Sequence, residues 1–170
     1  MRKLTKSVLV VVAVMLATTV VANAATAKAK PKPKPKSAAV AFVGSYSGQA
    51  TTLANGSNVT ITAKGTGSGT LIGAGAINAS GTGDSSQQPC VPFGGTGTIS
   101  GSGGTIAFKA NPGATGCGDE GGHNFTVKVY LAVTSATGKL ANAKGTLKAV
   151  GTYSHDDGSF QIKVTGSLTK

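Results

Sequence analysis

The stretch GTLKAVGTYSHDDGSFQIKVTGSLT, residues 145–169, predicts two β-strands joined by a tight turn. In its second half, apolar residues from Phe160 to Leu168 alternate with polar ones, which is the period of two that a half-buried strand produces. Residues 145–153 show a weaker form of this alternation. The pair Asp157-Gly158 between the two runs is a strong hairpin signal, so we expect these strands to pair antiparallel.

Residues 123–133, HNFTVKVYLAV, show the clearest alternation in the chain. Shorter runs predict five more strands upstream, at Val40–Thr52, Val59–Ala63, Gly69–Ile77, Thr96–Ser100 and Thr105–Ala110. About eight strands, closely spaced turns and no helical periodicity indicate a sandwich or a barrel. Glycine inside several strands favours the strongly coiled strands of a barrel. We therefore predict an all-β domain over residues 38–170, a single Gly-rich antiparallel β-barrel, with an adhesin-like β-solenoid as the alternative.

The N-terminus predicts export. Three positive charges in the first six residues precede an apolar run, Val8 to Val21, that ends in the small-residue sequence Ala22-Asn23-Ala24. These are the parts of a secretory signal peptide, residues 1–24, although an uncleaved anchor is an alternative. The run is shorter than the roughly 20 apolar residues of a membrane-spanning helix. We expect a secreted or cell-surface protein.

Residues 25–37 predict an extended Lys/Ala/Pro linker between the signal peptide and the domain. Proline fixes φ and favours polyproline II, so this segment could span roughly 40 Å at about 3.1 Å per residue. A solvated tether is the simplest interpretation. The alternative partner is an anionic cell-wall polymer or a membrane surface, contacted by the linker lysines Lys28, Lys30, Lys32, Lys34 and Lys36.

The formal net charge of +11 does not indicate nucleic-acid binding. Eight of the sixteen basic residues lie in the predicted signal peptide and linker, which leaves the domain with eight lysines, five acids and a net charge of +3. The only arginine, Arg2, belongs to the signal peptide, so the domain lacks the side chain that nucleic-acid readers favour for bidentate contacts. No nucleic acid is expected as a partner.

Residues 129–153, VYLAVTSATGKLANAKGTLKAVGTY, resemble a segment of the allene oxide cyclases and the plant dirigent proteins. In those families a strand ends in a glycine-rich turn, an aromatic residue follows, and Ala-x-Gly opens the next strand. Thr137-Gly138 and Ala143-Lys144-Gly145 match this order, whereas Ser135-Ala136 and Leu140 depart from it. The match lies mainly within residues 125–168, about a third of the domain. The resemblance implies an eight-stranded antiparallel barrel and, as an alternative function, an isomerase or cyclase acting on a small hydrophobic substrate.

The turn within this segment can also be interpreted without the resemblance. Gly138 can adopt the positive φ that closes the turn after Val133, and Leu140 and Ala143 can then plug one end of the barrel. The interior of an eight-stranded barrel is just wide enough to be filled by side chains or to hold one small ligand. The sequence leaves both alternatives open.

Cys90 and Cys117 predict one disulfide, because an even pair in an exported chain favours a bridge. It would join the QQPCVPFGG and GATGCGDEGG segments, most simply at one barrel end. Closing a loop of about 28 residues stabilises a fold by roughly 3.5 kcal/mol in the chain-entropy model.

No catalytic residue and no cofactor are predicted. The families of the resemblance use charged or polar lumenal groups, carboxylates among them, but Asp84 and the other four acids fall outside the predicted strands. Weak candidates for a loop metal site are Asp119, Glu120, His123, His155, Asp156 and Asp157, whose spacing matches no known ligand pattern. Solvated turns are the simpler interpretation of both clusters.

Three tyrosines are candidates for ligand contact, since an aromatic ring with a hydroxyl suits amphipathic molecules: Tyr46, Tyr130 and Tyr153. A small hydrophobic ligand is therefore a second candidate partner. From the sequence we expect an exported, non-catalytic β-barrel protein that serves as a cell-surface or extracellular binding or structural module.

Overall fold

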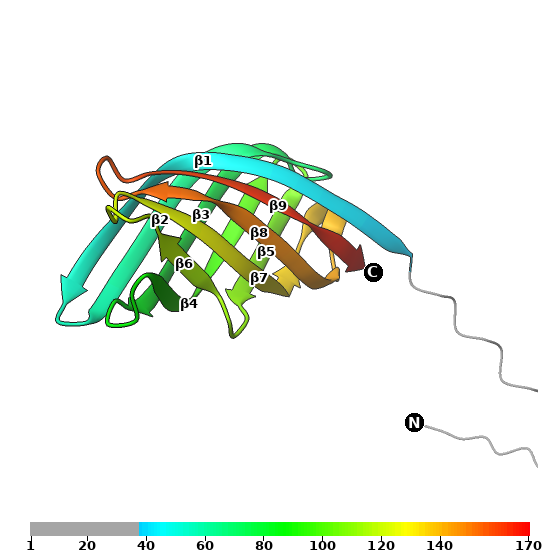
Figure 1. Ribbon diagram of the computed structural model, residues 1–170. Helices are drawn as coiled ribbons and strands as arrows, with labels where there is room; N and C mark the ends of the chain where they lie inside the picture. Colours follow the sequence, from blue (N-terminus) through cyan, green and yellow to red (C-terminus); the bar gives the residue numbers. More distant parts are fainter. Residues whose placement is uncertain (1–37) are drawn as a thin grey trace, which may run out of the picture. The chain divides into compact units, whose positions relative to one another are not determined.

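The computed structural model describes residues 38–170, which form a closed antiparallel β-barrel (Figure 1). The predicted signal peptide, residues 1–24, and the predicted linker, residues 25–37, lie outside the described residues. The elements of the barrel are β1 (Ala39–Asn55), β2 (Asn58–Gly69), β3 (Gly73–Asp84), β4 (Cys90–Gly101), β5 (Gly104–Ala110), β6 (Thr115–Gly118), β7 (Asn124–Ala136), the 3-10 turn η1 (Gly138–Leu140), β8 (Lys144–Ser154) and β9 (Ser159–Thr169).

The barrel has eight strand positions. Each of β1 to β4 pairs with the next strand along the chain, β5 then pairs with β7, and β7, β8 and β9 continue the sheet back to β1. β5 and β6 share one position, because both lie between β4 and β7. This closure confirms the predicted barrel and excludes the solenoid alternative for residues 38–170.

Several predicted strands differ from those observed. The β8–β9 hairpin is confirmed, with its turn at residues 155–158. The bounds predicted for the strand at Gly69–Ile77 are wrong. Gly69 is the last residue of β2, the next three residues form a turn, and β3 extends to Asp84. β4 begins at Cys90 rather than Thr96. The four-residue strand β6 was not predicted, because a segment this short contains too little alternation to detect.

Inward-facing glycines let large rings fit inside the barrel. Tyr46 on β1 lies directly opposite Gly67 on β2, and Phe108 on β5 lies opposite Gly97 on β4. A Cβ atom at Gly67 would lie 2.0 Å from the carbonyl oxygen of Ser45, so no larger residue fits at this approach of two strands. The glycine content of the sequence thus reflects close packing between neighbouring strands.

Large side chains fill one half of the interior, called here the closed end. Leu140 in η1 is fully buried and Ala143 is 2% exposed, which confirms that these two residues plug the barrel. Gly138 has φ of 63°, and a Cβ there would lie 2.2 Å from the carbonyl oxygen of Gly103, so the turn requires glycine. The other fully buried large side chains are Phe42, Ile72, Ile99, Ile106, Leu147, Val164 and Leu168.

The opposite end of the barrel, called here the mouth, is formed by four turns at residues 56–57, 85–89, 119–123 and 155–158. The chain enters the barrel at the closed end, where Ala39 at the start of β1 pairs with Thr169 at the end of β9 (Figure 1). Within the described part of the chain, no helix has the length and apolar character needed to cross a membrane.

Candidate ligand cavity

A cavity of about 640 Å³ occupies the half of the barrel next to the mouth. This volume lies within the range of small-molecule sites, roughly 300–1,000 Å³. Ser85, Gln88, Gly122 and His155 from three of the mouth turns contribute to its rim. Its walls include inward-facing side chains of β1 to β5 and β7 to β9, among them Val59, Ile61, Ile77, Ala79, Val91, Phe93, Ala110, Phe125, Val127, Val129, Leu131, Ala149, Tyr153 and Ile162.

Small residues at several inward positions contribute to the free volume of the cavity. Ala50, Ala63 and Ala79 lie side by side across β1, β2 and β3 and all line the cavity. Phe108 and Phe160 also line the cavity, and their rings pack over Gly97 and Gly65. Glycine therefore accommodates these rings inside the barrel, and the alanines leave free volume beside them.

Residues 38–170 place no charged side chain in the interior. Among them, no aspartate, glutamate or lysine lines the cavity, and none is buried. The polar groups that reach the cavity are neutral hydroxyl and amide groups, together with the imidazole of His155 at the rim. Such a surface gains free energy when apolar groups displace its water, and it offers no compensation for a buried charge.

All five acids of the domain gather at the mouth: Asp84, Asp119, Glu120, Asp156 and Asp157. Asp84 ends β3 rather than lying in a loop as predicted. Its carboxylate accepts hydrogen bonds from the hydroxyl and the backbone N–H of Ser86, at 2.7 and 3.0 Å, and these lower its pKa. A bond from the backbone N–H of Ser159, at 2.9 Å, lowers the pKa of Asp157.

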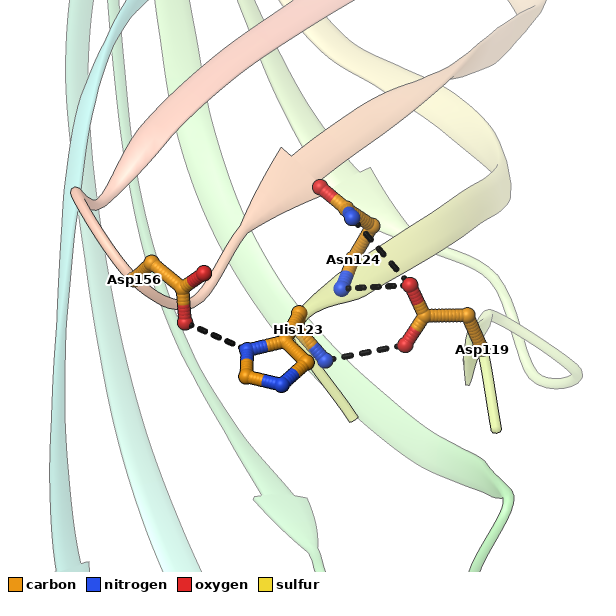
Figure 2. Close-up of polar contacts among 4 residues, drawn as sticks. All are labelled: Asp119, His123, Asn124 and Asp156. Atoms are coloured by element: carbon orange, nitrogen blue, oxygen red, sulfur yellow. Dashed lines mark hydrogen bonds and ion pairs between the residues drawn. The ribbon is translucent and has the colours of Figure 1, made fainter. Parts of the chain in front are cut away.

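Asp119 holds the turn between β6 and β7 in place (Figure 2). One carboxylate oxygen accepts the backbone N–H of His123 at 2.9 Å, and the other accepts the backbone and side-chain N–H groups of Asn124 at 3.2 and 3.1 Å. The bonds from Asn124 contribute most to lowering the pKa of Asp119. These interactions favour the ionised carboxylate, so the mouth is negatively charged at neutral pH.

His123 joins two mouth turns. Its Nδ1 lies 2.8 Å from Oδ1 of Asp156 (Figure 2). Its carbonyl oxygen accepts the backbone N–H of His155 at 2.7 Å. The hydrogen bond to Asp156 raises the pKa of His123. Both side chains are well exposed, at 63% and 64%. The contact therefore links the turns without burying charge.

The two clusters considered for a metal site do come together at the mouth, through His123 and Asp156. Asp119, however, directs both oxygens to N–H groups of its own turn. Within residues 38–170, no three side chains of His, Cys, Asp or Glu are grouped so that they could hold a metal ion.

The disulfide Cys90–Cys117 is present, as predicted. The two cysteines are directly opposite each other on β4 and β6 rather than in loops, and they lie next to the mouth turns. The bridge attaches β6, the shortest strand, to the wall of the cavity. A disulfide is typical of proteins that leave the cytoplasm.

The three tyrosines occupy three different environments. Tyr46 is 2% exposed within the filled half, Tyr130 is 46% exposed and points away from the interior, and Tyr153 lines the cavity. Only Tyr153 of these three can therefore contact a molecule in the cavity. The alternation in β7 and β8 contains this difference. Tyr130 lies on the outward-facing side of β7, and Tyr153 lies on the inward-facing side of β8.

The comparison with protein-family models and the search of curated proteins both found no match to this chain. The barrel itself does not identify a superfamily, since one architecture hosts many unrelated functions. The resemblance to allene oxide cyclases and dirigent proteins therefore stays a prediction.

Proposed function

We propose that this protein is an exported, non-catalytic binding protein that holds a small apolar ligand in the open half of its barrel. The observation that carries the proposal is the cavity of about 640 Å³, with walls of aliphatic and aromatic side chains and no charged group. Protein interiors are normally close-packed, with few voids larger than a water molecule. A volume of this size, left open beside inward-facing alanines, therefore indicates a ligand site.

Export is supported by the N-terminal sequence and by the disulfide. The chain enters the barrel at the closed end. Attachment to a cell surface through residues 25–37, by their lysines or by an uncleaved anchor, would therefore use the end of the barrel away from the mouth. Ligand uptake would not compete with attachment.

The proposal is tested with N-phenyl-1-naphthylamine, a neutral apolar dye whose fluorescence rises in apolar surroundings. We expect saturable binding of one dye per chain. Ala63→Phe places a ring at the centre of the alanine row, so it should weaken binding at least tenfold. The matched control is Thr62→Phe, because Thr62 is the exposed neighbour on the outer face of β2.

Absence of dye binding by the wild type would overturn the proposal. Equal binding by Ala63→Phe and Thr62→Phe would show that the dye binds elsewhere, which would also overturn it. Circular dichroism of each variant establishes that the barrel is intact.

A second candidate is the isomerase or cyclase that the resemblance implies, and one observation favours it: Tyr153 and His155, which carry a hydroxyl and an imidazole, line an open cavity. These groups could move a proton on a bound substrate. The discriminating measurement is whether a ligand that binds the cavity is recovered chemically unchanged after long incubation. A binding protein returns it unchanged.

A further inference from the structure

We propose that the natural ligand of the cavity is a cationic amphiphile, with an apolar body inside the barrel and an amine or quaternary ammonium group at the mouth. This inference rests on the proposed function, since it assigns the ligand class of the same cavity. It is carried by the separation of charge along the barrel and by the aromatic groups at the rim.

Acids and lysines occupy different parts of the barrel. All five acids lie in or directly beside the mouth turns. None of the eight lysines in residues 38–170 belongs to a mouth turn or lines the cavity. Six lysines are exposed on strands, and the other two lie at the closed end: Lys64, Lys109, Lys128, Lys144, Lys148 and Lys163, with Lys139 and Lys170.

An acidic mouth above an apolar cavity discriminates between head groups. A cation at the mouth is attracted by several carboxylates at once, and this attraction is screened by salt because the carboxylates are exposed. A fatty-acid carboxylate would meet like charge there, since none of the lysines in residues 38–170 lies at the mouth to neutralise it. The one imidazole in contact with an acid, His123, is already paired with Asp156.

Aromatic rings at the rim provide the second contact for a cation. Phe125 and Tyr153 lie opposite each other on β7 and β8, with ring centroids 6.1 Å apart, and both line the cavity. The ring centroid of His155 lies 6.5 Å from that of Tyr153, and His155 also lines the rim. Ammonium groups bind over the faces of such rings, most strongly when they are partly removed from water.

The experiment compares three C10 compounds below their micelle concentrations as competitors of the naphthylamine dye on the mature chain: decyltrimethylammonium, decanol and decanoate. At 20 mM salt we expect the ammonium compound to bind about fivefold more tightly than decanol, and decanoate about tenfold more weakly than the ammonium compound. The difference should shrink at 500 mM salt.

Two double variants locate the effect. Glu120→Gln with Asp156→Asn removes two charges from the mouth and should abolish most of the preference for ammonium over decanoate. Ser68→Lys with Ser167→Lys changes the net charge equally at exposed positions toward the closed end, and should retain the preference. Phe125→Leu should weaken ammonium binding more than decanol binding.

Each outcome decides a different claim. Failure of the dye itself to bind overturns the proposed function. If the dye binds but the three C10 compounds compete with equal affinity, or decanoate binds most tightly, the proposed ligand class is overturned. The proposed function is then unaffected. Equal loss of preference in both double variants overturns the role of the mouth, because net charge alone would then explain the selectivity.

Discussion

Replacing Gly97 by alanine should strongly destabilise the barrel, whereas the same change three residues earlier, at Gly94, should not. Both glycines lie within β4. A Cβ at Gly97 would lie 2.5 Å from the carbonyl oxygen of Asn78 on β3 and 2.5 Å from Cζ of Phe108 on β5. A Cβ at Gly94 would meet nothing within 4 Å.

The magnitude follows from these distances. Ordinary contact begins near 3.4 Å, so the carbonyl and the ring would each have to move by about 0.9 Å. Neither can move freely, because β4 is held between two strands. Overpacking of this kind typically costs 1–3 kcal/mol and sometimes more, so we expect Gly97→Ala to lose about 3 kcal/mol. Gly94→Ala should gain about 0.5 kcal/mol, because alanine restricts the unfolded chain more than glycine does.

The assay is equilibrium unfolding in urea, followed by far-UV circular dichroism and tyrosine fluorescence, since the chain has three tyrosines and no tryptophan. A shift of the midpoint at constant slope reports the change in stability. If the two variants unfold within about 0.5 kcal/mol of each other, the strands do not approach as closely as described, and the account of the glycines as packing residues is refuted.

Three further predictions concern the disulfide, the Tyr46 hydroxyl and the His123–Asp156 contact. Cys90→Ala with Cys117→Ala should lower the free energy of unfolding by about 3.5 kcal/mol, because the bridge closes a loop between residues 27 apart; a loss below about 1 kcal/mol in urea unfolding would contradict this. Tyr46→Phe should be neutral or stabilise the fold by about 1 kcal/mol, because the Tyr46 hydroxyl is buried without a hydrogen-bond partner; a clear loss of stability would point to a partner such as a buried water. The pKa of His123, measured by NMR, should lie above 6.5 and return toward that value in Asp156→Asn. Since the folded-state pKa is raised, any stabilisation by the His123–Asp156 contact is fully present below pH 6.5 and is lost as the pH rises through the raised value, so an unchanged pKa in Asp156→Asn would contradict the contact.

The amino-acid sequence alone determined the elements with local signals. Alternation over residues 125–133 and 160–168 marks strands whose one face is buried, and the Asp157-Gly158 turn places two of them side by side. The Cys90–Cys117 disulfide and the positive φ of Gly138 could also be predicted, because each depends more on residue type than on distant parts of the chain. β6 could not be predicted from the sequence, because it has only four residues and its partners are distant parts of β4 and β7. The start of β4 could not be predicted either, because glycines interrupt its alternation.

Only the tertiary structure decided that the barrel is filled at one end and open at the other. The sequence places alanines and glycines on inward positions, but whether they leave space depends on which residues face them across the sheet. The register sets Ala50, Ala63 and Ala79 side by side, where they leave space in the cavity, and it sets the ring of Tyr46 against Gly67, where the ring fills the interior. The convergence of all five acids at one end has the same cause: turns that are distant in sequence meet when antiparallel strands close into a barrel.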